Sequence, residues 1–269
     1  MAALLACPEC GHSLHPGDRA LRCPTGHSFD LAKQGYVSLL TGAATKMSGD
    51  TADMLDARAA FQGAGHFAAI AAAVAEAATG PGPVLDVGAG TGYYLARVLD
   101  AHPDRHGIAL DVAKPAARRA ARAHPRMASV LADAWGGLPV RDAAIGTVLS
   151  VFAPRNPAEV ARVLGPGGRF VVVTPTAGHL GELVGPLGMV RVDPDKERRL
   201  TEAMDGVFAR LATTPVEFAM PLSRADVTRV IAMGPSAFHG APADDPRIAA
   251  LPETTEVTAS VTVSVFAPA

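Results

Sequence analysis

Four residues near the start of the chain have the types and the spacing of a structural zinc site. They follow the order Cys7-x2-Cys10-x12-Cys23-x3-His27, and the chain contains no other cysteine. Cys and His pairs on tight turns converge on one tetrahedral Zn²⁺, and four protein ligands leave no coordination position open for a reacting molecule. The pattern therefore predicts a structural zinc ion held by these four residues.

Two other histidines and the small number of cysteines bear on this interpretation. His12 and His15 are alternative fourth ligands, although their position between the two pairs favours His27.

An odd number of cysteines makes a poor disulfide framework, and the N-terminus lacks the basic and apolar regions of a secretory signal. The sequence has no run of about 18 apolar residues, the length that spans a membrane. We therefore expect a cytoplasmic protein with no membrane partner.

A glycine-rich turn further along the chain indicates a cofactor site. It follows an apolar run, opens a helical stretch and reads Asp86-Val87-Gly88-Ala89-Gly90-Thr91-Gly92. Its spacing, G-x-G-x-G, differs from the G-x-G-x-x-G of dinucleotide-binding turns. A carboxylate before the first glycine repels a pyrophosphate and attracts a cofactor that carries an ammonium and a sulfonium group. S-adenosylmethionine carries both, so we expect it to bind at Asp86, Gly88, Gly90 and Gly92.

Two further acids follow the next predicted strands and extend this cofactor site. Asp111 lies 19 residues after Gly92, where an acid accepts hydrogen bonds from ribose hydroxyls in other nucleoside-binding α/β folds. Asp133 is placed to meet the adenine amino group, and Trp135 is placed to border the ring. Each acid taken singly is also typical of a helix cap or a turn. Their order at successive strand ends favours cofactor binding.

The elements that must position these residues alternate between strands and helices. Helical patterns cover 52–78, with breaks at Gly63 and Gly65, and then 93–99 and 115–123. The predicted parallel strands are 84–87, 107–111, 129–132, 147–152 and 169–173. Residues 256–266 alternate with period two, which predicts an antiparallel strand at the sheet edge. This order predicts an α/β protein with a Rossmann-like sheet that helices cover on both faces.

Three regions are expected along the chain. Residues 1–40 form the small N-terminal zinc-binding module, and residues 41–80 form a linker and helices that border the active site. Residues 81–269 form the methyltransferase domain, in which an irregular segment at about 176–240 caps the site. The cofactor and metal signals thus fall in different regions.

Two kinds of methyl transfer are disfavoured by the residues present. Methylation of pyrimidine C5 needs a cysteine nucleophile, and every cysteine of this chain lies in the zinc motif. Enzymes that methylate exocyclic amines usually carry Asn/Asp-Pro-Pro-Tyr/Phe after the fourth strand. The corresponding segment here reads Val151-Phe152-Ala153-Pro154-Arg155-Asn156-Pro157, with the aromatic residue and the proline in a different order.

Several segments together resemble bacterial 23S ribosomal RNA (guanine-N1)-methyltransferases. The first runs from Cys7 through Cys23-Pro24-x-x-His27-x-Phe29-Asp30-x-Ala32-Lys33-Gln34-Gly35-Tyr36-Val37. The others are Gly49-Asp50-Thr51, Ala57-Arg58-x-x-Phe61, Gly65-His66-Phe67, Phe152-Ala153-Pro154, His179-Leu180 and Met233-Gly234-Pro235-Ser236. The likeness covers nearly the whole chain and is greatest to the branch that includes the tylosin-resistance methyltransferase.

The resemblance implies a class I methyltransferase fold with S-adenosylmethionine and Zn²⁺ as cofactors. It also implies that the zinc module helps to bind RNA and that the enzyme is a homodimer. The substrate of that branch is a guanine in a 23S rRNA hairpin loop near the peptide exit tunnel, and its methylation confers macrolide resistance of the tylosin type. Each of these properties is an expectation for this chain.

Methylation of guanine N1 sets requirements that a few residues of the chain meet. N1 lies on the Watson–Crick edge and carries a proton, so the base must be unpaired or flipped, and a general base would assist. Asp50, His179 and Glu182 are candidates for that base, as is Glu159, and all four are also typical of surfaces or caps. Phe152 and Phe238 are candidates for stacking on the guanine, although such residues more often pack in the core.

The charge distribution leaves two other functions open. The formal net charge is −2, so an RNA partner has to be bound by a local surface such as Arg22 and Lys33 in the zinc module. Arg118, Arg119 and Arg122 share one helical face and form an alternative surface. A small-molecule methyltransferase explains the weak charge but leaves the zinc module without a role. A non-catalytic zinc RNA-binding protein leaves the glycine-rich turn unexplained.

Overall fold

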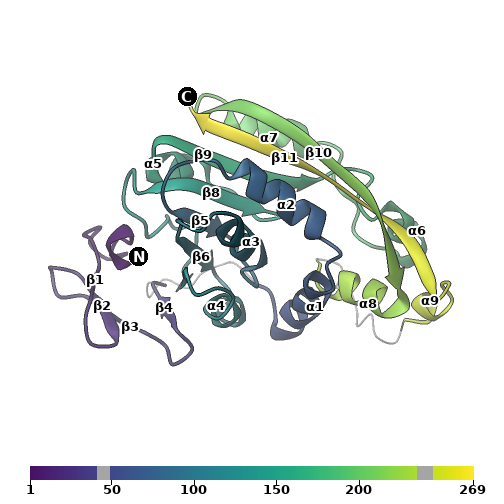
Figure 1. The fold of residues 1–269 in the computed structure, drawn as a ribbon, viewed down its shortest axis with the longest axis horizontal. Coiled ribbons are helices and arrows are strands. Elements are labelled where there is room, and N and C mark those ends of the chain that lie inside the picture. Colours follow the sequence, from purple (N-terminus) through teal and green to yellow (C-terminus); the bar gives the residue numbers. More distant parts are fainter. Residues whose placement is uncertain (41–48, 235–244) are drawn as a thin grey trace.

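The computed structural model describes residues 1–40, 49–234 and 245–269, and a mixed eight-stranded sheet dominates this part of the chain (Figure 1). From one edge to the other its strands are β10 (Phe208–Ser223), β11 (Thr254–Pro268), β9 (Leu164–Pro175), β8 (Ile145–Val151), β5 (Val84–Val87), β6 (Gly107–Asp111), β7 (Met127–Leu131) and β4 (Tyr36–Ser38). The six strands from β9 to β4 run parallel, and β11 and β10 run antiparallel to their neighbours. The predicted α/β sheet is therefore confirmed.

The central strands are apolar along their length because helices cover both faces of the sheet. Every residue of β5 and β8 is buried, which fits strands without a solvent-facing side. Alternate residues face opposite layers, so Leu149 packs in one core cluster and Val148 in the other. The parallel arrangement places the carboxyl ends of neighbouring strands along one edge of the sheet, the usual location of ligand sites in such folds.

The helices divide between the two faces of the sheet. One core cluster combines sheet residues with α1 (Ala52–Gly63), α2 (Ala68–Ala77), α3 (Tyr93–Ala101), α6 (Gly181–Leu187), α8 (Arg224–Ala232) and α9 (Pro246–Ala249). The second core cluster combines other sheet residues with α5 (Pro157–Val163) and α7 (Lys196–Met204). Small buried alanines bring α4 (Lys114–Ala120) against β6 and β7. The predicted helical segments are present, including the break between α1 and α2 around Gly63 and Gly65.

Two expectations about the C-terminal part of the chain are wrong. The period-two strand β11 is not at the sheet edge, because β10 pairs with it on the outer side. Within the segment expected to be irregular, 208–223 form the long strand β10 and other residues form helices. Most of β10 is exposed on both faces, and it contains Pro215 and Pro221. Neither burial nor alternation therefore marked it as a strand in the sequence.

The N-terminal residues form a small three-stranded sheet that joins the main one. Its strands are β1 (His15–Pro16), β2 (Ala20–Arg22) and β3 (Ser28–Asp30), and a short helix η1 (Ala2–Leu4) precedes them. Soon after β3, β4 pairs in parallel with β7 at the edge of the main sheet. Leu5 and Leu14 pack in the same core cluster as Leu85 and Ile108. The zinc-binding module is thus continuous with the core of the α/β part.

Candidate zinc centre and cofactor pocket

The four predicted zinc ligands lie together between the turns of the N-terminal module. The ligand atoms of Cys7, Cys10, Cys23 and His27 are all within 4.8 Å of one another. The Sγ atoms of Cys10 and Cys23 are 3.7 Å apart, and His27 Nδ1 is 3.5 Å from Cys7 Sγ and 3.4 Å from Cys23 Sγ. A tetrahedral zinc ion bound at ~2.3 Å to sulfur and ~2.0 Å to nitrogen sets ligand atoms about 3.5–3.8 Å apart. The donor set and its dimensions therefore fit Zn²⁺.

The two alternative histidines take no part in this cluster among the residues that the structure describes. His12 Nδ1 lies 3.1 Å from the carbonyl oxygen of Cys10, so its ring turns to the backbone. His15 belongs to β1 and is exposed. The geometry thus favours His27 as the fourth ligand, as its spacing predicts.

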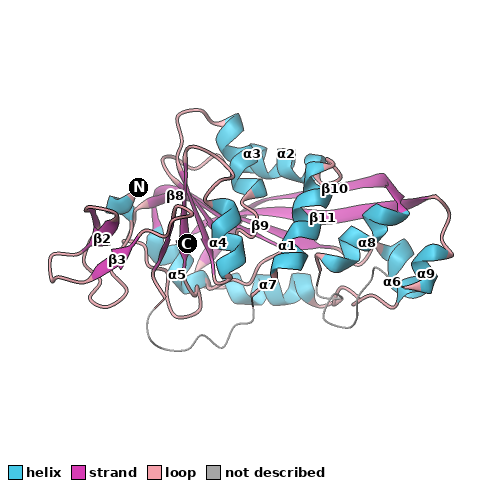
Figure 2. Cartoon of the chain, turned by 90° about the horizontal axis from the view of Figure 1, so that it is seen from below, coloured by secondary structure: helices cyan, strands magenta, loops and turns pink. Residues whose placement is uncertain are grey.

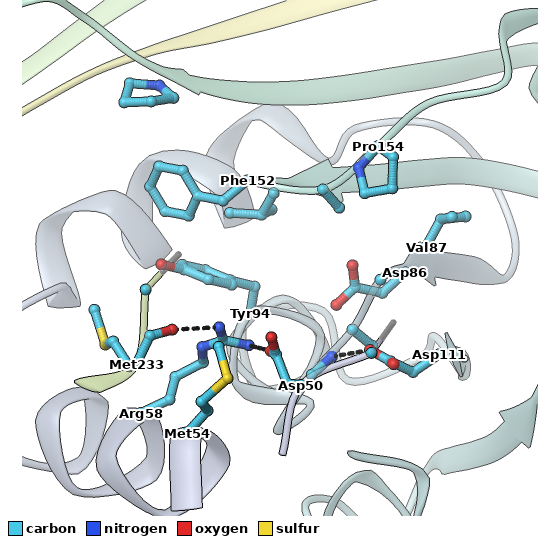
Figure 3. A pocket seen from close by; sticks show the side chains of 18 of the residues that line it. Asp50, Met54, Arg58, Asp86, Val87, Tyr94, Asp111, Phe152, Pro154 and Met233 are labelled. Carbon is cyan, nitrogen blue, oxygen red and sulfur yellow. Dashed lines mark hydrogen bonds and ion pairs between the residues drawn. The ribbon is translucent and has the colours of Figure 1, made fainter. Parts of the chain in front are cut away.

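The predicted cofactor residues border a cavity of about 650 Å³ at the carboxyl ends of β5, β6 and β8 (Figure 3). This volume is in the range that holds a nucleoside cofactor. Of the predicted cofactor residues, five line it: Asp86, Gly88, Gly90, Asp111 and Asp133. Gly92 lies one step further, as the N-cap of α3. Segments far apart in sequence complete the wall, from residues 49–67, 151–154, 179–196 and 230–234.

Asp86 lies near the end of β5 as a buried carboxylate without its full set of partners. The residue is 2% exposed, and within the described residues Oδ2 has no hydrogen-bond partner. Burial, with a smaller contribution from the nearby Asp111, raises the pKa of Asp86 to about 7. A cationic ligand would supply the missing partner and favour the ionised form. This unpaired carboxylate fits the ammonium or sulfonium group of S-adenosylmethionine.

Two positions of the glycine turn after β5 have no room for a side chain. Gly88 has a φ of +75°, and a Cβ there would lie 2.6 Å from the Cβ of Ala153. Gly90 also has a positive φ, and a Cβ there would lie 3.0 Å from Nη1 of Arg58. Both positions therefore require glycine for conformation and for close approach of other chain segments.

Asp111 and Asp133 lie at successive strand ends, as predicted. Asp111 Oδ2 accepts a hydrogen bond from the Gly90 N–H at 2.8 Å, and Oδ1 accepts one from the Ala113 N–H at 2.8 Å. Each carboxylate oxygen retains a second lone pair, so these bonds orient Asp111 without using its full capacity toward ribose hydroxyls. Asp133 accepts from the backbone N–H of Trp135 at 2.9 Å, and Trp135, a residue 52% exposed, lines the cavity. Their ligand roles stay predictions.

Arg58 links three segments of the cavity wall and was not predicted as a site residue. Nη1 donates to Asp50 Oδ2 at 2.5 Å, and Nη2 donates to the carbonyl oxygen of Met233 at 2.7 Å (Figure 3). Asp50 is therefore an ion-pair partner rather than a free base. No local sequence rule joins residues 50, 58 and 233, because the contact depends on α1 packing against α8.

Phe152 presents an aromatic face in the cavity from a strained backbone. Its φ is +54°, the residue is 40% exposed, and its N–H donates to the Val173 carbonyl oxygen across the sheet. A bulky residue in the left-handed region costs on the order of 1 kcal/mol or more and usually marks a functional position. Its ring centroid lies 6.2 Å from Phe67 and 5.9 Å from His179. The geometry favours a stacking surface over ordinary core packing.

The remaining candidates for the general base have other partners. His179 lines the cavity, and burial, together with Lys196, lowers the pKa of its imidazole to about 4. Glu182 accepts from the N–H and the hydroxyl of Thr258, and Glu159 from the Leu138 N–H and Arg162. Neither glutamate is among the cavity-lining residues of the described chain. Phe238 lies outside the described residues.

Comparison with protein families identifies two parts of the chain. The family model "RlmA, N-terminal", a zinc ribbon, matches residues 5–48, and the model "Methyltransferase domain" matches residues 84–168. These ranges contain the four-ligand cluster and the glycine turn. A solved structure titled "Conversion of a Disulfide Bond into a Thioacetal Group during Echinomycin Biosynthesis" shares the fold at 13% identity, with a TM-score of 0.50 over 73% of this chain and 80% of that one.

Two curated relatives match the chain over nearly its full length. The 23S rRNA (guanine(748)-N(1))-methyltransferase of Streptomyces fradiae is 48% identical over 98% of this chain and 96% of its own. A Micromonospora griseorubida protein assigned to the 23S rRNA (guanine-N(1)-)-methyltransferases is also 48% identical, over 98% of this chain and 97% of its own. With the fitted sites, these matches give S-adenosylmethionine and zinc as the cofactors. The chain therefore belongs to the family of 23S rRNA (guanine-N1)-methyltransferases.

Proposed function

We propose that this enzyme transfers the methyl group of S-adenosylmethionine to N1 of a guanine in 23S rRNA. The observation that carries the proposal is 48% identity to the Streptomyces fradiae enzyme across the zinc ribbon and the methyltransferase domain together. The name of that relative specifies guanine 748. We infer the corresponding guanine as the target here, in the hairpin loop near the peptide exit tunnel.

The residues of the cavity support this chemistry. When bound, S-adenosylmethionine supplies an electrophilic methyl group, and Asp86 and the glycine turn would hold its charged end. The target base has to leave its stack, because N1 is hidden in a paired or stacked guanine. The exposed ring of Phe152 offers a surface on which an extruded base can stack. Positioning N1 behind the methyl group would provide much of the acceleration.

The test is methyl transfer to a defined RNA. We expect tritium from labelled cofactor to enter an unmodified 23S rRNA hairpin, with a reverse-transcription stop one nucleotide before the target guanine, because a substituted N1 blocks base pairing. A hairpin that already carries 1-methylguanosine at this position is the matched control and should accept no label. Label in that control, or a stop elsewhere, would contradict the proposed atom or nucleotide.

The division of labour between the two parts is a further element of the proposal. We infer that residues 1–40 contribute to RNA recognition, that 41–80, of which 41–48 lie outside the described residues, border the active site, and that 81–269 carry catalysis, with a cap at about 176–240. Several residues of this last range, from His179 to Lys196, line the cavity. A small-molecule substrate would leave the ribbon without a role, so the RNA substrate is favoured.

Three physiological expectations accompany the RNA substrate. We propose a homodimer, by resemblance, which analytical ultracentrifugation of the purified protein tests. We propose a cytoplasmic location, where 23S rRNA is found. Separately, every helix in the described ranges is too short or too polar to span a membrane. We also propose that expression in a susceptible bacterium raises the inhibitory concentration of tylosin, and that the Phe152→Ala variant raises it less.

A further inference from the structure

His179 is held in the cavity in one orientation and one neutral tautomer. Its Nδ1 lies 3.1 Å from the backbone nitrogen of Ser260 on β11, and that N–H is a donor only. Nδ1 must therefore be the unprotonated acceptor, and the proton of the neutral ring is on Nε2. The pKa of about 4, caused by burial and by Lys196, keeps the ring neutral near pH 7. His179 is thus a hydrogen-bond donor through Nε2.

The donor belongs to the same aromatic group as the exposed stacking surface. The rings of His179 and Phe152 lie 5.9 Å apart with an interplanar angle of 29°, and Phe67 is 6.0 Å from His179. A centroid separation of this size indicates offset rings rather than face-to-face contact. Because Nδ1 faces the backbone of β11, Nε2 lies on the other side of the imidazole ring, and both His179 and Phe152 line the cavity. No described residue makes a hydrogen bond to Nε2.

Methylation of guanine N1 is assisted by a hydrogen-bond donor near the base. The N1–H proton must leave before or during attack, and the resulting negative charge is shared with O6, the acceptor next to N1. N1 then forms a bond to the methyl carbon, the carbon–sulfur bond breaks with its electron pair remaining on sulfur, and the N1 proton passes to water. A fixed donor at O6 stabilises this charge where it develops. A group that donates at O6 also selects guanine over adenine, which carries an amino group there.

We propose that His179 Nε2–H donates to O6 of the target guanine and stabilises its N1-deprotonated form. This inference rests on the proposed function and deepens it, because it assigns a specificity-determining and catalytic role to a residue that does not abstract the proton. Donation through Nε2 also agrees with the low pKa of His179, which makes this residue a poor general base at neutral pH.

Two substitutions separate donation by Nε2 from the structural role of Nδ1. In His179→Asn, the amide oxygen can still accept from the Ser260 N–H, but no donor replaces Nε2–H. In His179→Gln, the longer side chain can place an amide N–H near the position of Nε2. We expect kcat to fall about 100-fold in H179N, the size typical of one lost oxyanion donor, and less than about tenfold in H179Q. Calorimetry should show cofactor affinity within about twofold of wild type in both.

The substrate supplies the complementary half of the test. Three hairpin RNAs carry guanine, inosine or 6-thioguanine at the target position. Inosine keeps O6, so the ratio of wild-type to H179N rates should stay near about 100. In 6-thioguanine a weakly accepting sulfur replaces O6, so the ratio of wild-type to H179N rates should fall below about 5. This ratio is informative even if both enzymes methylate 6-thioguanine RNA slowly.

The outcomes distinguish this inference from the function on which it depends. An equal rate for wild type and H179N on guanine RNA would overturn it, as would a ratio that is the same with 6-thioguanine as with guanine. If H179N loses cofactor binding, His179→Leu, which offers no donor, takes its place, and a ratio of wild-type to variant rates that is the same with 6-thioguanine as with guanine overturns the inference there. A wild-type enzyme that does not methylate the guanine RNA would overturn the proposed function as well.

Discussion

At the scale of single residues, the site depends on polar groups that are costly for the fold to bury. Asp86 is buried with one oxygen unpaired, and the hydroxyl of Tyr94, also on the cavity wall, is buried without a hydrogen bond in the described part of the chain. Unsatisfied buried groups of this kind lower stability and mark places where a ligand completes the bonding. The ionisation of Asp86 and the exposed ring of Phe152 are therefore the two features whose consequences can be measured directly.

Cofactor affinity should depend on the ionisation of Asp86. Since its pKa is about 7 in the free protein, binding a cation beside it below pH 7 requires loss of a proton. We expect affinity to be constant above pH 7 and to fall by up to about tenfold per unit below it. Asp86→Asn should weaken binding at pH 8 and abolish the slope. Calorimetry from pH 5.5 to 8.5 measures both, with Asp104→Asn, an exposed acid on the loop after α3, as the control. A pH slope that persists in Asp86→Asn would contradict the assignment.

The same substitution should stabilise the protein in the absence of cofactor. The pKa of Asp86 is raised from 3.8 to about 7 on folding, so the ionised carboxylate is less favourable in the folded than in the unfolded state. The cost is absent below pH 4, grows as pH rises and is complete above pH 7. Asp86→Asn should therefore raise Tm at pH 8 by several degrees and change it little at pH 4. Calorimetric scans at the two pH values check this, and a Tm that falls at pH 8 would argue against a buried, unpaired carboxylate.

Replacing Phe152 should affect the RNA step and spare the cofactor. Loss of one base–aromatic stack costs about 1–3 kcal/mol, so Phe152→Ala should lower kcat/KM for the hairpin by about 5- to 150-fold. Phe152→Trp keeps a stacking surface and should retain most activity. Cofactor affinity of both variants, measured by calorimetry, should stay within about twofold of wild type. Equal losses in the Ala and Trp variants would indicate that the position serves packing only.

At the scale of elements, the local sequence pattern predicted the buried strands of the sheet and missed the exposed one. The strands β5, β6 and β8 are short apolar runs, and the acids Asp86 and Asp111 lie at the ends of two of them, so both the sheet and these site residues could be found from the sequence. The exposed strand β10 has no such pattern, because pairing with β11 rather than burial defines it. Arg58 was missed for a related reason, since its partners come from distant segments.

Zinc should stabilise the whole molecule and not only the ribbon. The ligands Cys7 and Cys23 pack in a core cluster shared with Leu85 and Val148, and β4 extends the main sheet. Small modules of this kind lack a sufficient core without metal, so its removal should unfold the ribbon and take away its support of the β7 edge. We expect chelation or Cys23→Ser to lower a single calorimetric transition by several degrees, with about one zinc lost per chain by metal analysis. Two separate transitions, the larger unmoved by chelation, would show that the α/β part is independent of the ribbon.

At the scale of the whole molecule, the zinc ribbon and the C-terminal helices lie at opposite ends of the long axis, with the sheet between them (Figure 1 and Figure 2). An RNA hairpin that places one base in the cavity can therefore contact surfaces beyond it. The net charge of −2 provides no general attraction for RNA, so these contacts must come from local basic residues. Sequence composition indicated that such a surface is needed, but only the fold places its candidates relative to the cavity.

The ribbon residues Arg22 and Lys33 are the first candidates for that surface. Both are exposed, and neither forms an ion pair with a described residue. Removing one phosphate interaction reduces the salt dependence of RNA binding by about one unit of log–log slope. The double Ala variant should therefore bind hairpin RNA more weakly, with a slope smaller by about one to two units. Its affinity for the cofactor should be unchanged, because the glycine turn lies in a different part of the molecule.

A matched pair of arginines on α4 and the turn after it makes this experiment decisive. Arg118 and Arg122 are exposed like the ribbon pair, whereas Arg119 between them is held by Asp56 at 2.5 Å. Filter binding across a salt series, with the double Ala variants Arg22/Lys33 and Arg118/Arg122 side by side, compares equal reductions of charge at two places. If the ribbon binds the RNA, only the first pair changes the slope, because the net charge is altered equally in both. A slope that changes only with the second pair would move the RNA surface from the ribbon to α4.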